Sequence, residues 1–221
     1  MGSSLVSLLV LAGIAIFLVL RLRNILGTRE GFEKPRVDPL SADNSTSPKR
    51  QFEVIEGGVD HDIIDNVPEG SRAADNLAVL KRNEPNFTVA EFLTGASAAY
   101  EMILMAFENG DLSEVSDFIS DDVEEAFLSV IDSRADAGLT VEAQFIGLHE
   151  VQIIDVELDE AARDEEIKLR FVSEITSVAR DENGDIVEGD PNTVKRQKDI
   201  WTFAREMGSD DPNWQLVATG A

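Results

Sequence analysis

The chain has 221 residues, a formal net charge of −24 and no cysteine. Its length suits one ordinary domain with appended segments. The lack of cysteine excludes disulfides, thiolate metal sites and cysteine nucleophiles. The acidity is concentrated in residues 86–221, with 31 Asp and Glu against 9 Lys and Arg. Nucleic-acid phosphates repel such a segment, so nucleic-acid binding is not expected. A basic partner suits it, although a merely soluble surface has the same composition.

The first strong signal is the run LVSLLVLAGIAIFLVL at residues 5–20, in which Ser7 is the only polar residue and no residue is charged. With its neighbours it gives about 18 to 20 uncharged residues, enough for a helix that spans a bilayer. Basic residues follow the run instead of preceding it, which favours an uncleaved anchor over a cleaved signal peptide. The predicted anchor residues are Leu5, Leu8, Leu9, Leu11, Ile14, Ile16, Phe17 and Leu20.

Three arginines on the C-terminal side of the run, Arg21, Arg23 and Arg29, predict the orientation of the anchor. By the positive-inside rule the N-terminus is outside and the rest of the chain is cytoplasmic, or faces the matrix in a mitochondrion. The same arginines are expected to contact anionic lipid headgroups. The chain has no Arg-rich, acid-poor presequence, which favours a bacterial inner membrane.

The composition divides the chain into three parts: an anchor with its basic flank (1–26), a flexible polar linker (27–70) and a folded domain (71–221, with its core at 86–221). The linker contains four prolines, a Gly-Gly pair and no sustained apolar period. At the start of the domain, residues 71–82 predict a short helix capped by Ser71.

Capping signals predict the helices of the domain core. Thr88 and Glu91 form a capping box ahead of apolar residues at three- and four-residue spacing, and this helix ends near Gly110. Small residues at positions 95–99 keep its middle slim, so another element can approach closely. Asp111 predicts a short second helix, and Ser120 predicts a third.

After residue 138 the apolar period changes from helical to alternating, as in Ile167, Leu169 and Phe171. Asn-Gly at 183–184 is a hairpin signal. Helices followed by antiparallel strands predict an α+β domain whose helices pack on one face of a curved sheet. The clearest further strands are expected at residues 141–158, with a bend near Gly147, at 193–206 and at 214–219.

The residues offer little for catalysis or metal binding. The two histidines, His61 and His149, have no second ligand at metal-site spacing, and no nucleotide-binding or hydrolase motif occurs. The acidic stretch at 181–185 lacks the spacing of a calcium loop and fits a hairpin tip. We therefore expect no enzyme activity, no cofactor and no metal. A curved sheet under helices can still enclose an apolar pocket, which leaves a small-molecule site as an alternative.

Several sequence blocks resemble a known family in their order and spacing. They are residues 92–103 (FLTGASAAYEMI), 106–111 (AFENGD), 187–191 (VEGDP), 199–205 (DIWTFAR) and 211–216 (DPNWQL). Together they resemble the C-terminal domain of the mitochondrial inner-membrane translocase motor adaptor, the Tim forty-four-like family. The single N-terminal anchor resembles the alphaproteobacterial members. The mitochondrial chaperone-binding segment precedes the shared domain and has no match in residues 27–70.

The resemblance implies a cone-shaped fold of the cystatin and nuclear-transport-factor kind, without enzyme activity. It also implies protein transport at an inner membrane, with a heat-shock chaperone or a protein translocase as partner. We thus expect an anchored adaptor that binds a chaperone, a translocon subunit or an unfolded chain in an apolar groove. The alternatives are a lipid or small-molecule binding module and a structural subunit of a membrane complex. The candidate groove residues, which core packing also explains, are Phe92, Tyr100, Trp201 and Phe203.

Overall fold

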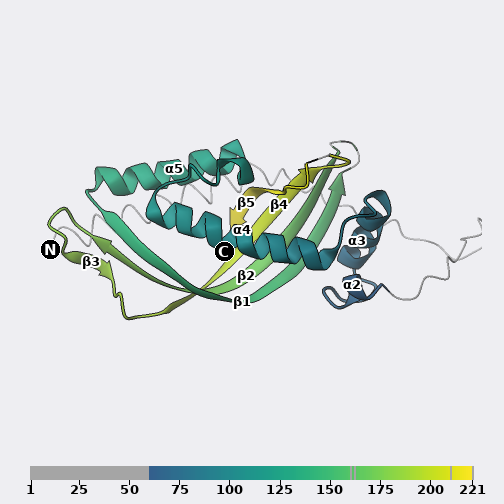
Figure 1. The fold of residues 1–221 in the computed structure, drawn as a ribbon, viewed down its shortest axis with the longest axis horizontal. Coiled ribbons are helices and arrows are strands. Elements are labelled where there is room, and N and C mark those ends of the chain that lie inside the picture. Colours follow the sequence, from purple (N-terminus) through teal and green to yellow (C-terminus); the bar gives the residue numbers. More distant parts are fainter. Residues whose placement is uncertain (1–59, 160, 162, 210, 221) are drawn as a thin grey trace, which may run out of the picture. The chain divides into compact units, whose positions relative to one another are not determined.

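The structure is a computed structural model that describes residues 60–159, 161, 163–209 and 211–220. The predicted anchor at residues 5–20, its basic flank and residues 27–59 of the predicted linker lie outside the described residues. The described part is an α+β domain with an antiparallel sheet and several helices (Figure 1). This confirms the α+β class with an antiparallel sheet that the sequence predicted.

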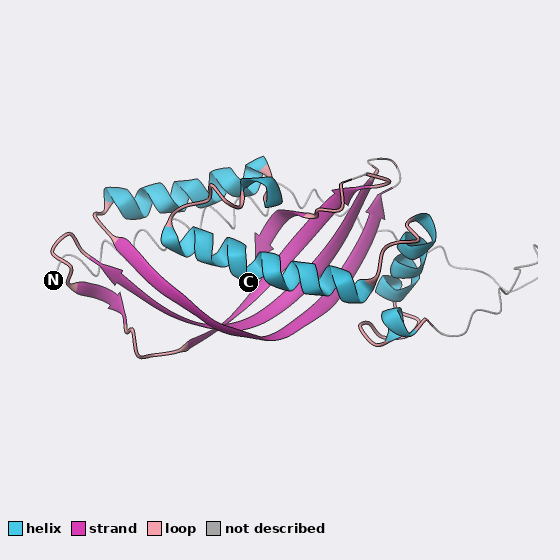
Figure 2. Ribbon diagram, in the orientation of Figure 1, coloured by secondary structure: helices cyan, strands magenta, loops and turns pink. Residues whose placement is uncertain are grey.

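The sheet is formed by the second half of the domain. Its strands lie side by side in the order β1-β2-β4-β5. Strand β3 follows the Asn-Gly turn and pairs with the C-terminal end of β2. Figure 2 shows two long helices, α4 and α5, on the same side of this sheet. The strands are β1 (Thr140–Asp159), β2 (Asp164–Arg180), β3 (Ile186–Gly189), β4 (Lys195–Glu206) and β5 (Gln215–Gly220).

The long strand β1 bends through three register irregularities against β2. The first lies between Phe145 and Gly147, where the sequence predicted a bend, and the others follow Leu148 and Ile153. Each bulge adds an unpaired residue and increases the local twist. The sheet can therefore curve around α4, which lies across it (Figure 1).

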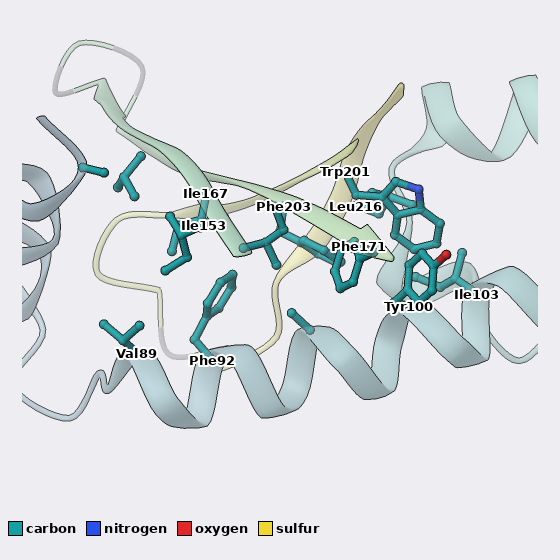
Figure 3. Close-up of a cluster of buried hydrophobic side chains, with 14 of the residues drawn as sticks. Val89, Phe92, Tyr100, Ile103, Ile153, Ile167, Phe171, Trp201, Phe203 and Leu216 are labelled. Carbon is teal, nitrogen blue, oxygen red and sulfur yellow. The ribbon is translucent and has the colours of Figure 1, made fainter. Parts of the chain in front are cut away.

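Helix α4 (Val89–Asn109) supplies the central layer of the core. It begins at Thr88, whose hydroxyl oxygen accepts a hydrogen bond from the Glu91 backbone N–H at 3.2 Å. It ends at Gly110, where φ is +76°, a conformation that glycine adopts without strain. Figure 3 shows Phe92 and Tyr100 directed from the helix toward the strands.

The segment between α4 and α5 (Asp121–Asp136) differs from its prediction. In place of a short α-helix after Asp111, the structure contains only a 3-10 turn, η1 (Ser116–Phe118). The Asp111 carboxylate accepts a hydrogen bond from the Ser113 backbone N–H at 3.0 Å, and this local turn competes with a helical start. The Ser120 N–H then donates to the Leu216 carbonyl at 2.9 Å, which ties the segment to β5.

Residues 60–70, which the sequence analysis assigned to the linker, are folded onto the domain. They contain helix α2 (His61–Ile64), and the side chains of Ile63 and Val67 are buried in the core. Asp62 accepts hydrogen bonds from the backbone N–H groups of Val89 and Ala90, at 2.8 and 3.0 Å, and so caps α4 from outside. The domain boundary therefore lies before this helix and not at residue 71.

Helix α3 (Arg72–Asn83) follows as predicted, with the Ser71 hydroxyl oxygen accepting from the Ala74 N–H at 3.2 Å. Leu77 and Leu80 are fully buried, and Asn76 donates to the Val156 carbonyl of β1 at 2.7 Å. By length and composition, α4 is the one helix among the described residues that could cross a membrane. A core helix passes the same test, and α4 packs Phe92, Tyr100 and Ile103 against the sheet.

Candidate functional site

A groove of about 730 Å³ lies between α4 and the segment that joins β4 to β5. Its walls combine aromatic side chains with a floor of small residues, and charged groups gather at one end. The lining residues include Glu84, Phe87, Phe92, Gly95, Ala98, Ala99, Met102, Phe203, Arg205 and Trp214.

The floor of the groove is the slim face of α4. Gly95 and Ala98 are exposed, and a Cβ atom added to Gly95 would meet no heavy atom within 4 Å. Met102, one turn further along, is 38% exposed. Small side chains let another chain approach the helix backbone closely, so this face is open to a ligand or a partner. The sequence signalled this feature through its run of Gly and Ala.

An aromatic cluster forms one wall of the groove. The Trp214 ring lies edge-on to Phe92, with centroids 4.9 Å apart, and 6.1 Å from the centroid of Phe87. Phe92 in turn contacts the edge of Phe203 at a centroid distance of 6.4 Å. Such clusters supply large apolar contact areas with fixed geometry. Trp214 is partly exposed and therefore available at the groove surface.

A buried ionic cluster closes one end of the groove. Arg205 forms ion pairs with Glu84 and, at 3.3 Å, with Glu165. Burial lowers the pKa of the Arg205 guanidinium and raises the pKa of the Glu165 carboxyl. One Glu165 oxygen and Arg205 Nε have no hydrogen-bond partner in the described structure. No local sequence pattern indicates this cluster, because its members are 40 and more residues apart.

The four predicted groove residues fall into two places. Phe92 and Phe203 line the groove, although most of each side chain is buried. Tyr100 and Trp201 lie further along the core, with ring centroids 4.7 Å apart, and neither lines the groove. Phe92 and Phe203 thus belong to the groove, and Tyr100 and Trp201 belong to the core that supports it.

Tyr100 is the centre of a buried polar network on the helix side of the sheet. Its hydroxyl donates to the Asp199 carboxylate at 2.6 Å, lies 2.8 Å from the Ser173 hydroxyl and accepts from the Gln197 amide at 3.2 Å. Burial and the neighbouring Asp199 raise the pKa of Tyr100 to about 12. The phenol therefore stays protonated at neutral pH and holds α4 to β2 and β4.

The two histidines lie apart from the groove. His61 is 3.9 Å from Asp65 on the exposed side of α2, and His149 is 3.0 Å from Glu174 on the sheet. Within the described ranges, no group of three or more His, Asp or Glu side chains is placed to hold a metal ion. The arrangement at the groove suits binding of an apolar surface more readily than proton transfer.

Comparison with known proteins gives one clear relationship. A family model described as the Tim44-like domain matches residues 73–221, two thirds of the chain. No curated protein matches the chain. Among solved structures, the intermembrane space region of the chloroplast protein ARC6 aligns with a TM-score of 0.38 and 11% sequence identity. That alignment covers 58% of this chain and 94% of the ARC6 chain.

Proposed function

The chain belongs to the Tim44-like domain family, and on that basis we propose that it is a membrane-anchored adaptor that binds a protein partner in the groove on α4. The family is one of membrane-associated, non-catalytic adaptors, which supports an adaptor role over an enzymatic one. Family membership supports the general adaptor role, and the groove is the surface at which we expect the partner to bind.

One observation carries the proposal most directly: the exposed small-residue face of α4 lies beside a partly exposed tryptophan. Gly95 and Ala98 leave room for a helix or an extended chain, and Trp214 offers the large aromatic contact typical of binding hot spots. A fully packed core helix would bury this face, as α4 does with Tyr100 and Ile103 on its other side.

The finer features of the proposal come from the sequence. Residues 5–20 anchor the chain in a bacterial inner membrane with the N-terminus outside, and a linker gives the cytoplasmic domain its reach. The curved sheet under α4 supports a cone-shaped fold. The partner is a heat-shock chaperone, a translocon subunit or an unfolded chain, in keeping with a role in protein transport.

A second candidate is a lipid or small-molecule binding module that uses the same groove. The volume of about 730 Å³ and the largely apolar lining support this alternative, since ligand pockets commonly have this size and character. Ligand-dependent melting separates the two, because a ligand that binds only the folded state must raise the melting temperature with its concentration. A structural subunit would instead be unstable without one fixed partner.

The direct test compares two exposed positions on α4, one inside the groove and one outside it. Gly95→Leu fills the groove, whereas Thr94→Leu adds the same side chain at an exposed position that does not line it. The full chain carrying each change is purified from membranes and its partners are quantified. The adaptor proposal predicts that one partner is lost from Gly95→Leu and retained by Thr94→Leu. Equal partner recovery from both variants would contradict it.

A further inference from the structure

The face of the sheet turned away from α4 and α5, called here the outer face, carries a cluster of basic residues. In β2, Lys168 and Arg170 alternate with core residues such as Leu169. In β4, Asp199 and Gln197 bind Tyr100 on the helix side, so Arg196 and Lys198 point to the opposite face.

The pairing of β2 with β4 brings these side chains together. Lys198 lies opposite Val172, and Arg170 lies opposite Ile200, with no irregularity in the register between them. Neighbouring strands are about 4.8 Å apart and alternate residues about 7 Å apart, so the group covers an area roughly two strands wide. We name the four side chains the basic outer patch: Lys168, Arg170, Arg196 and Lys198.

Few of the charges of this patch form a salt bridge, although Asp155 lies opposite Lys168 and Glu174 lies opposite Arg196 across the strands. Arg170 binds Glu150 and donates to Gln152 at 2.7 Å on β1. In the part of the chain that the structure describes, Lys168, Arg196 and Lys198 form no salt bridge. Four of the nine basic residues in the acidic segment 86–221 thus lie together on one face. A partner that bound these four residues would form new ion pairs with them. Among the described residues, an existing ion pair would be broken at Arg170, and none at the other three.

The sheet surface between the basic side chains is closely packed. Val172 is only 2% exposed, and Thr202 and the half-buried Ile200 lie beside it on β4. No described helix covers this area, since α4 and α5 both lie on the other side of the sheet (Figure 2). The half-buried Ile200 offers apolar surface between the positive charges, which suits a chain in which acidic and apolar residues alternate.

We propose that the basic outer patch is a second docking surface, which binds an acidic segment of a partner protein. A narrow segment can follow the patch and avoid the carboxylates that border it, Glu150, Asp155, Glu166 and Glu174. A planar anionic membrane would meet those carboxylates together with the basic residues and would be repelled by them. The geometry therefore favours a polypeptide over a lipid surface.

This surface lies on the opposite side of the sheet from the groove, and it does not depend on what the groove binds. A domain with an apolar groove on one face and a basic patch on the other can hold two different partners at once. That arrangement would extend the adaptor role from tethering one protein to joining two.

The test uses the full chain in neutral-lipid nanodiscs and a labelled peptide that alternates glutamate with leucine. Lys168→Gln/Lys198→Gln removes two charges from the patch. Arg82→Gln/Lys195→Gln removes two charges elsewhere, on α3 and on the helix side of β4. The proposal predicts binding that weakens with salt and a five- to tenfold loss, approximately, in the patch variant only.

Two further samples make the outcome decisive. Gly95→Leu should bind the peptide normally, which separates this surface from the groove. Vesicles of phosphatidylglycerol should not bind the patch more tightly than the peptide does. The proposal is overturned by absence of peptide binding, by equal losses in the two charge variants, or by vesicle binding that replaces peptide binding.

Discussion

The guanidinium of Arg205 lies over the indole ring of Trp214, with its central carbon 4.8 Å from the ring centroid. Arg205 belongs to β4, and Trp214 lies just before β5, so this contact fixes the wall of the groove. Glu84 after α3 and Glu165 in β2 bind the same guanidinium. One buried side chain therefore holds together the elements that shape the proposed binding surface.

Replacing Arg205 should destabilise the domain. Arg205→Met leaves Glu84 and Glu165 without their cation, and removing one partner from a buried ion pair typically costs about 3 kcal/mol of unfolding free energy. Urea denaturation measures the change. The double variant Arg205→Met/Glu165→Gln should recover part of the loss, because it removes one uncompensated buried charge. A single variant within about 0.5 kcal/mol of the wild type would show that the cluster has no structural role.

Tyr100 should titrate far from the ordinary range. It is the only tyrosine in the chain, so the ultraviolet absorbance of tyrosinate reports on it alone. The folded protein should show a pKa of about 12, and the denatured protein one near 10.0. A folded-state pKa above the unfolded value means that the stabilisation is complete below pH 10 and disappears as the pH rises toward 12. A folded-state titration near pH 10 would contradict the buried network.

Tyr100→Phe tests the same network at neutral pH. The change removes the hydroxyl that joins Asp199, Ser173 and Gln197 and keeps the ring that stacks on Phe171 at 4.3 Å. We expect an unfolding free energy lower by about 1–2 kcal/mol, the usual cost when a hydrogen bond to a charged group is lost. An unchanged urea midpoint would indicate that the network contributes nothing to stability.

Two glycines, one within α4 and one directly after it, should respond in opposite ways to alanine. Gly95 lies within the helix in open space, so Gly95→Ala should raise the unfolding free energy by roughly 0.5–1 kcal/mol through helix propensity. Gly110 ends the helix at φ +76°, and Gly110→Ala should lower it by about 1 kcal/mol. Thermal melting of the two variants beside the wild type measures both changes. Destabilisation by Gly95→Ala would mean that the α4 face is packed and not open.

Asp62 should stabilise the domain although it precedes the predicted boundary. Burial favours a higher pKa for Asp62, but Lys81 and the N–H groups of Val89 and Ala90 outweigh it and lower the pKa overall. The stabilisation is therefore present above pH 3.8, the ordinary value, and is lost as the pH falls below it. Asp62→Ala should lower the unfolding free energy at neutral pH by about 1–2 kcal/mol, as for a lost helix cap.

The exposed Asp75 in the first turn of α3 provides the matched control. Asp75→Ala removes the same charge and should change the unfolding free energy by less than about 0.5 kcal/mol. Equal effects of the two substitutions would mean that Asp62 acts only through its charge and not as the cap of α4. That outcome would contradict the capping role of Asp62.

Local signals account for most of what the sequence predicted correctly. Ser71, Thr88 and Ser120 each cap a helix through a bond to a residue three positions later, and Gly110 ends α4 through its own backbone preference. The short helix predicted after Asp111 is not formed. The Asp111 carboxylate accepts a hydrogen bond from the Ser113 backbone N–H, and this turn competes with the start of a helix.

Contacts between residues far apart in the chain could not be predicted from the sequence. Asp62 caps a helix that begins 27 residues later, and Arg205 meets a carboxylate 40 residues away. Nothing in the local pattern of either residue specifies such a partner. For the same reason the sequence identified four aromatic candidates but could not separate Phe92 and Phe203, at the groove, from Tyr100 and Trp201 in the core.

The adaptor role is tested most directly by photocrosslinking in native membranes from a reactive residue at Ala98 on the floor of the groove, with Glu101 on the same helix as the control position outside it. The account predicts adducts to one protein, a chaperone or a translocon subunit, from Ala98 and none from Glu101. Adducts only to lipid or small molecules, or no adduct from Ala98, would contradict the adaptor role.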